Sequence, residues 1–361
     1  MPPPPDLPSL LLQAAAGPLS SADRAWQLWR RLQLPSQAPP AQARLLPAIY
    51  ARRHALTLSP ADLPLLASLH HLAWARNQCL LNAAASLIPP LAAASIHPLF
   101  LKGLPLLATA YPDQGACYLS DVDFMVPKPQ VELALQALRA VGWSLANPSP
   151  LHSWSHHIPL LSPEGLTCEL HWGLLIPPHP EIDESPLIAR RFSFPLRQQT
   201  AAMPAPEALL LQLMARGITR EKNGRPLRWI HDVQVLLNHF PIDWPRFLQE
   251  AQTRQSGLIL HRAALALEAI APGRFPAQVL DQLLPPRSSL RQHATCAFVT
   301  RDFPQTPLLA LPSTAALFLS RSRSAATALR GWPGLPRYCA RALLRRCRPT
   351  SPPPPHSSPL P

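Results

Sequence analysis

The stretch Ser120-Asp121-Val122-Asp123-Phe124-Met125-Val126 decides the fold, because two carboxylates one residue apart begin an apolar run there. Side chains alternate along a strand with a period of two, so Asp121 and Asp123 would share one face and the apolar residues the other. Like charges about 6–7 Å apart on one face repel each other unless a cation lies between them. The stretch therefore predicts a strand with a site for a hard divalent metal, or alternatively a strand end whose acids are solvated.

A second run, Leu166-Thr167-Cys168-Glu169-Leu170-His171-Trp172, has the pattern of a strand that places Glu169 and His171 on one face. If this strand lies beside the first, Glu169 joins Asp121 and Asp123 in a group of three carboxylates. Three carboxylates suit two Mg²⁺ ions, one that activates an attacking hydroxyl and one that holds a triphosphate. Glu169 would then bind the first ion or assist deprotonation.

The third candidate element is Lys102-Gly103, which follows a short apolar run and precedes an expected helix. Glycine permits close backbone approach to a phosphate, a helix N-terminus favours an anion, and the Lys102 ammonium adds a positive charge. The alternative is a simple strand-to-helix turn with an exposed lysine.

The apolar periodicity around these motifs predicts an α+β fold with a small mixed sheet and flanking helices. It also predicts helices before the sheet, from about residue 21 to 87, and a helical C-terminal domain. The expected strands are 98–101, 120–126, 156–161 and 166–172, and the expected helices near and after them are 104–110, 129–141, 207–216, 228–240, 245–255, 258–270 and 277–284.

Composition divides the chain into five segments. The 361 residues include 49 prolines, which are dense in the expected disordered tails, residues 1–20 and 349–361. Between them we expect a helical region at 21–95, the core with the sheet at 96–200, and a helical domain with a basic end at 201–348.

The formal net charge is +13, and nearly all the basic residues are arginine. Eight arginines lie between residues 321 and 348, after the last acidic residue, Asp302. An amphipathic helix at 338–348 would bind nucleic acid or an anionic membrane surface, and a solvated basic tail is the alternative.

The six cysteines show no C-x-x-C spacing, which argues against a zinc ribbon and a thioredoxin-like site and favours reduced thiols. The proline-rich start lacks the pattern of a signal peptide, and the most apolar window, residues 80–100, is interrupted by Pro89, Pro90 and Pro98. We therefore expect a soluble, cytoplasmic protein.

The order and spacing of these motifs resemble the uncharacterised nucleotidyltransferase family of the DNA polymerase beta superfamily, over about residues 60 to 270. The motifs are Phe100-Leu101-Lys102-Gly103, Ser120 to Val126, His156-His157, Glu169-Leu170-His171-Trp172, Leu227-Arg228-Trp229-Ile230-His231-Asp232 and Asp243-Trp244. One departure is that residues 115–119 contain no arginine, which members of the family often have before the Asp-x-Asp motif.

The resemblance implies a small nucleotidyltransferase fold that moves a nucleotidyl group from a nucleoside triphosphate to an acceptor. It assigns Mg²⁺, with Mn²⁺ as an alternative, to the catalytic residues Asp121, Asp123 and Glu169. The nucleotide-binding residues would be Lys102, Gly103 and Ser120. The acceptor would be a peptide, a sugar, another small molecule or an RNA end. A non-catalytic binding or biosynthetic accessory protein with the same fold is the alternative.

Four further residues are candidates for contacts around this site. His157 and His171 would contact substrate or support the metal ligands, or would be hydrogen-bonded within the fold. Arg228 and Asp232, four residues apart on a helix, would form an ion pair, with a contact to substrate as the alternative.

Overall fold

The fold is given by a computed structural model, which describes residues 6–146, 157–175, 182–218 and 227–284. These residues belong to one compact unit that ends at Ser288. The second unit, which includes the arginine-rich end, lies outside the described residues, as do His156 and both ends of the chain.

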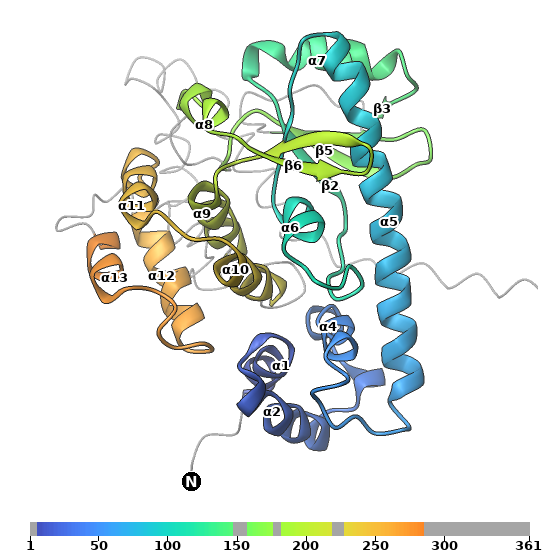
Figure 1. Cartoon of the computed structure of the whole chain (residues 1–361), viewed down its shortest axis with the longest axis vertical. Helices are drawn as coiled ribbons and strands as arrows, with labels where there is room; N and C mark the ends of the chain where they lie inside the picture. The colour runs from blue at the N-terminus through green and yellow to red at the C-terminus, as the bar shows by residue number, and fades with distance from the viewer. Residues whose placement is uncertain (1–5, 147–156, 176–181, 219–226, 285–361) are drawn as a thin grey trace, which may run out of the picture. The chain divides into compact units, whose positions relative to one another are not determined.

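The centre of the fold is a seven-stranded mixed sheet with the order β3-β4-β5-β2-β1-β7-β6 (Figure 1). β2 pairs in parallel with β5, and β1 pairs in parallel with β7, whereas the remaining pairs are antiparallel. The strands are β1 (Leu99–Phe100), β2 (Val122–Met125), β3 (Ser144–Leu145), β4 (His157–Leu161), β5 (Thr167–His171), β6 (Phe192–Leu196) and β7 (Gln199–Met203). The expected α+β fold with a mixed sheet is confirmed.

The β6–β7 hairpin extends the sheet beyond the four expected strands. We predicted neither strand of this hairpin from the sequence. β6 contains Pro195 and an exposed Phe192, and the buried part of β7 includes alanines rather than the β-branched residues that favour strands. Because β7 continues to Met203, the boundary that we predicted at residue 200 falls inside a strand and is wrong.

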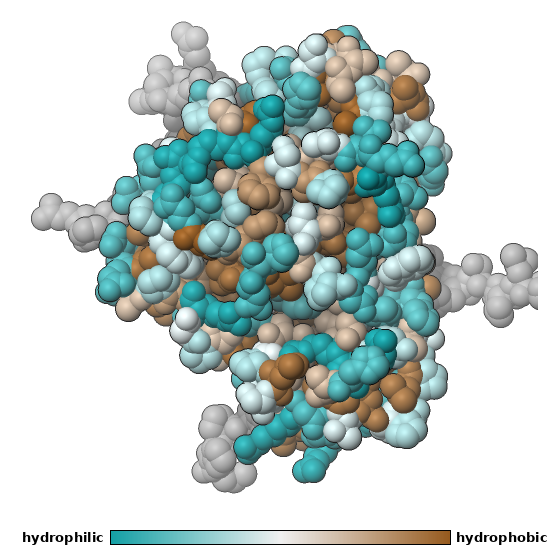
Figure 2. All heavy atoms as spheres, viewed as in Figure 1, coloured by the Kyte–Doolittle hydropathy of each residue, from teal (hydrophilic) through white to brown (hydrophobic). Residues whose placement is uncertain are grey.

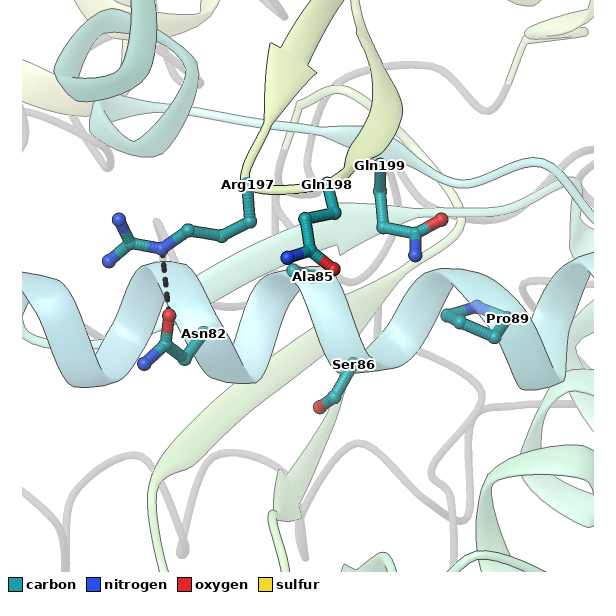
Figure 3. Close-up of a pocket in the computed structure, with 7 residues that line it drawn as sticks. All are labelled: Asn82, Ala85, Ser86, Pro89, Arg197, Gln198 and Gln199. Carbon is teal, nitrogen blue, oxygen red and sulfur yellow. Dashed lines mark hydrogen bonds between the residues drawn. The ribbon is translucent and has the colours of Figure 1, made fainter.

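The turn of this hairpin lies against helix α5 (Leu63–Ala93), beside a pocket lined by residues of both elements (Figure 3). Arg197 in the turn has a positive φ of 57°, and its Nε donates a hydrogen bond to Asn82 Oδ1 at 2.7 Å. This solvent-exposed interaction connects the hairpin turn with α5.

α5 contacts α4 as well as β2, β7 and α7 (Val131–Arg139), so it connects the sheet with the helices before it. Pro89 and Pro90 lie within α5 and do not end it, contrary to the interruption that we expected. The two missing N–H groups fall close to the end of the helix, where Leu87 and Leu91 are fully buried. No helix among the described residues meets the length and apolarity needed to cross a membrane.

The N-terminal helices begin earlier than we expected. α1 (Leu7–Ala16) lies within the segment that we predicted as a disordered tail, and that prediction is wrong for these residues. Its Leu11 and Leu12 are buried, and the helix contacts α2, α4 and α10, so the apolar face outweighs the proline content. Pro8 lies in the first turn, where its missing N–H does no harm.

The remaining helices confirm the helical character of the regions on both sides of the sheet. Four apolar side chains on α2 and just after it stay exposed, namely Leu19, Leu28, Leu32 and Leu34. Figure 2 shows brown, hydrophobic patches near the bottom of the view, where Figure 1 labels α2. The helices not yet bounded are α2 (Leu19–Leu32), α3 (Pro40–Ala43), α4 (Leu46–Ala51), α6 (Gly103–Thr109), α8 (Ser185–Ala189), α9 (Pro206–Gly217), α10 (Arg228–His239), α11 (Trp244–Thr253), α12 (Gly257–Glu268) and α13 (Ala277–Leu283), with 3₁₀ turns at Pro35–Gln37 and Lys128–Gln130.

Candidate metal and nucleotide site

The two strands that carry the carboxylates are neighbours, as we expected. In the parallel pairing of β2 with β5, Asp123 lies opposite Glu169. Asp121 precedes β2, and carboxylate oxygens of all three acids lie within 4.8 Å of one another. Val122 and Phe124 are fully buried and anchor this strand in the core. The sheet therefore brings together three negative charges from two strands.

The positive charge nearest to this cluster is Lys102. Its ammonium group forms an ion pair with Asp123 Oδ1 and lies 3.5 Å from Glu169 Oε2. Burial alone would raise the pKa of Asp123, but the ammonium group and a hydrogen bond with His171 outweigh this effect and lower it. Burial would raise the pKa of Glu169 as well, but its hydrogen bond with His171 and the charge of Lys102 outweigh burial and lower this pKa.

Asp121 is the least compensated of the three carboxylates. Burial, followed by repulsion from the charge of Asp123, raises the pKa of Asp121. Its one described hydrogen bond to a side chain comes from Ser120, whose Oγ donates to Oδ1 at 2.7 Å. An added cation would therefore relieve most repulsion on the Asp121 side of the cluster.

The Lys102-Gly103 turn has the strand-to-helix position that the sequence predicts. Lys102 has φ 57° and ψ −132°, and its backbone N–H donates to Gln212 Oε1 at 3.1 Å. A Cβ on Gly103 would lie 2.9 Å from Leu119 Cδ2 and 3.1 Å from Arg228 Nη2. A larger residue here would have to displace the ends of these two side chains, and a contact of Gly103 with phosphate stays a prediction.

His157 and His171 face each other across the antiparallel pair of β4 and β5. Their ring centroids are 5.4 Å apart, and both Nε2 atoms approach Glu169, at 3.7 Å from Oε1 for His157 and 3.3 Å from Oε2 for His171. His171 is buried, and its Nε2 also lies 2.8 Å from Asp123 Oδ1. Burial lowers the pKa of His157. Both histidines therefore adjoin the carboxylates, and a role in supporting metal ligands or contacting substrate stays a prediction.

Arg228 and Asp232 form the predicted ion pair, with 3.2 Å between Nε and Oδ2. Arg228 Nη1 also donates to the Tyr118 carbonyl at 2.6 Å, and Tyr111 donates its hydroxyl to Asp232 Oδ1 at 2.6 Å. Burial opposes the charge of Arg228, but the charge of Asp232 outweighs burial and raises the pKa of the guanidinium. The pair joins α10 to the loop that leads into β2.

Sequence reasoning missed the residues of α5 that hold this loop. Asn77 Nδ2 donates to the carbonyls of Gln114 and Cys117, and the N–H of Leu119 donates to Asn77 Oδ1 at 3.2 Å. Arg76 Nε donates to the Leu119 carbonyl at 2.9 Å. Residues 115–119 contain no arginine, and Arg76 reaches this loop from a helix instead. No local signal could have revealed it, because about forty residues separate the partners.

A family model described as uncharacterised nucleotidyltransferase matches residues 40–272, which include the whole sheet and the three carboxylates. No curated protein matches the chain with significance. Among solved structures, an antigenic nucleotidyltransferase-like protein from Paracoccidioides brasiliensis is similar over 64% of this chain and 96% of its own, with 16% identity and a TM-score of 0.30.

Proposed function

The chain belongs to the family of uncharacterised nucleotidyltransferases, and from this premise we propose that it transfers a nucleotidyl group from a nucleoside triphosphate to an acceptor. The observation that carries the proposal is the convergence of Asp121, Asp123 and Glu169 within 4.8 Å. Bound Mg²⁺ would neutralise the triphosphate and lower the pKa of an attacking hydroxyl. The location that we propose for the activity is cytoplasmic.

The donor set fits a hard divalent cation. Three carboxylates supply the oxygen ligands that Mg²⁺ and Mn²⁺ favour. The Lys102 ammonium lies against Asp123 and Glu169, so the cluster already attracts a positive charge. Burial and, after it, the charge of Asp123 raise the pKa of Asp121 although Lys102 lowers it, so repulsion between the two aspartates adds to the effect of burial.

Each residue near the carboxylates has a role in this proposal. Asp121 and Asp123 hold the ions, and Glu169 binds an ion or accepts the proton of the acceptor hydroxyl. Ser120 orients the Asp121 carboxylate through its hydrogen bond. Lys102 leaves the carboxylates when metal binds and places its ammonium on a phosphate of the donor, beside Gly103.

The ion pair of Lys102 also favours a second function, that of a non-catalytic binding or accessory protein with this fold. In that case the ammonium permanently takes the place of a metal ion between Asp123 and Glu169. Binding of Mn²⁺ to the purified protein, measured by isothermal titration calorimetry, separates the two functions. If the protein is the enzyme, it binds Mn²⁺ and Asp121→Asn weakens that binding. If it is the accessory protein, it binds no Mn²⁺.

The activity itself is tested by incubating the full chain with each α-labelled nucleoside triphosphate, Mg²⁺ and a cell extract as the source of acceptor. We expect a labelled product from one or more donors, and Asp121→Asn and Asp123→Asn should abolish it. Asp281→Asn, a change of an exposed carboxylate on α13, is the matched control and should leave labelling unchanged. Equal labelling by all four proteins would overturn the proposed site.

A further inference from the structure

His157, Glu169 and His171 form a second group of potential metal ligands that shares one residue with the carboxylate cluster. One donor atom from each lies within 4.8 Å of the other two. Two neighbouring strands position them, because His157 lies opposite His171 in the pairing of β4 with β5. Residues 157 and 171 are therefore held by the sheet and not by a loop.

The spacing of these donors suits one small cation. Tetrahedral ligands with metal bonds of about 2.0–2.1 Å lie about 3.3–3.4 Å from each other. The Nε2 atoms of His171 and His157 lie 3.3 and 3.7 Å from the two oxygens of Glu169. One donor atom of each residue already lies within 4.8 Å of the other two, a separation that a common ion would shorten.

The donor types differ from those of the carboxylate cluster. Imidazole nitrogen binds Zn²⁺ and similar transition metals well, whereas Mg²⁺ favours oxygen ligands. Two histidines and one glutamate are also a ligand set that leaves a fourth position of Zn²⁺ open for water or substrate. We propose that His157, Glu169 and His171 bind a Zn²⁺-type transition-metal ion directly, as ligands and not as supports for the Mg²⁺ ligands.

This inference rests on the proposed function in one respect, because it takes Asp121 and Asp123 as the ligands of the neighbouring Mg²⁺ site. Glu169 belongs to both groups, so an ion on the histidines would lie next to the place of the nucleotide phosphates. His171 Nε2 also lies 2.8 Å from Asp123 Oδ1. If this nitrogen carries the proton, Zn²⁺ binding must release that proton to solvent before the nitrogen lone pair can coordinate.

The experiment uses the full chain after removal of metals with a chelator, without nucleotide. Zn²⁺ affinity is measured by competition with a chromophoric chelator, and the number of imidazole ligands by X-ray absorption at the zinc edge. We expect one equivalent of zinc with two imidazole ligands. His157→Gln should leave one imidazole ligand and weaken zinc binding at least tenfold. The loss of a residue that only orients a metal ligand can weaken binding by about the same factor. The count of imidazoles therefore decides between a ligand and a support.

His97→Gln, at an exposed position, is the matched control and should change neither the affinity nor the count. His157 is preferred for the test because its side chain is 32% exposed, against 3% for His171, so its replacement is less disruptive. Circular dichroism verifies that the variant is folded. A wild-type complex without imidazole scattering, or equal loss in the His97 variant, would overturn the inference.

The two proposals fail in different ways. Labelling with Mg²⁺ alone by a protein that binds no zinc would refute the histidine site and leave the proposed function intact. Zinc bound through two imidazoles, in a protein that labels no acceptor with any donor, would support the histidine site and count against the proposed function.

Discussion

Replacing Asn77 by alanine should lower the free energy of unfolding by about 3 kcal/mol. Asn77 is fully buried on α5, and its amide makes three hydrogen bonds to the loop before Asp121. Two of them, to the Cys117 carbonyl and the Leu119 N–H, are themselves buried. A buried backbone group left without a partner costs about 1–3 kcal/mol, so two such groups give about 3 kcal/mol.

Asn82→Ala is the control, because it makes the same change on the exposed side of the same helix. Its side chain accepts one exposed hydrogen bond from Arg197, and surface substitutions of this kind change stability by about 0.5 kcal/mol or less. The gain in helix propensity from asparagine to alanine is common to both variants and cancels in the comparison. Guanidinium denaturation followed by tryptophan fluorescence measures both.

The same substitution should also weaken Mn²⁺ binding, because the loop that Asn77 holds leads directly to Asp121. A difference of less than about 1 kcal/mol between the Asn77 and Asn82 variants would show that water satisfies the loop as well as the amide does. Such a result would refute the role of α5 in positioning the carboxylates.

Three other outcomes are expected. Acidification from pH 7 to 5 should lower the free energy of unfolding by about 2 kcal/mol through His231, since burial lowers its pKa from 6.5 to about 4 and only the unfolded chain then gains a proton; denaturation of His231→Gln should lack this contribution. Lys102→Gln should tighten Mn²⁺ binding about tenfold, because it removes a cation that competes for the carboxylates. Electron paramagnetic resonance of free Mn²⁺ measures this affinity, and weaker binding by the variant would contradict the competition. Arg254→Met should destabilise the fold by about 3–5 kcal/mol because it leaves Glu184, a buried partner at 2.7 Å, without its counter-charge; a denaturation midpoint near that of the parent protein would contradict this.

Strand periodicity was enough to predict β2, β5 and the shared face of Glu169 and His171, because side-chain direction within a strand depends only on position. It could not predict β6 and β7. The buried residues of β7 are Ala201, Ala202 and Met203, and this strand joins the sheet by pairing with β1 and by contacting α5. β6 contains Pro195 and an exposed Phe192 and pairs only with β7 among the described strands. Likewise, α1 forms in a proline-rich segment because contacts with α2, α4 and α10 accompany the burial of Leu11 and Leu12.

The sequence by itself determined which side chains are candidates for the chemistry, since the spacing of Asp121 and Asp123 and the family motifs are local properties. Tertiary structure alone decided that Lys102 lies against Asp123 and Glu169, that Asn77 and Arg76 hold the preceding loop, and that His157 faces His171. The physical reason is that these contacts join residues 14 to 67 positions apart. Such contacts form when apolar surfaces of distant segments are buried together, and no short-range pattern encodes that pairing.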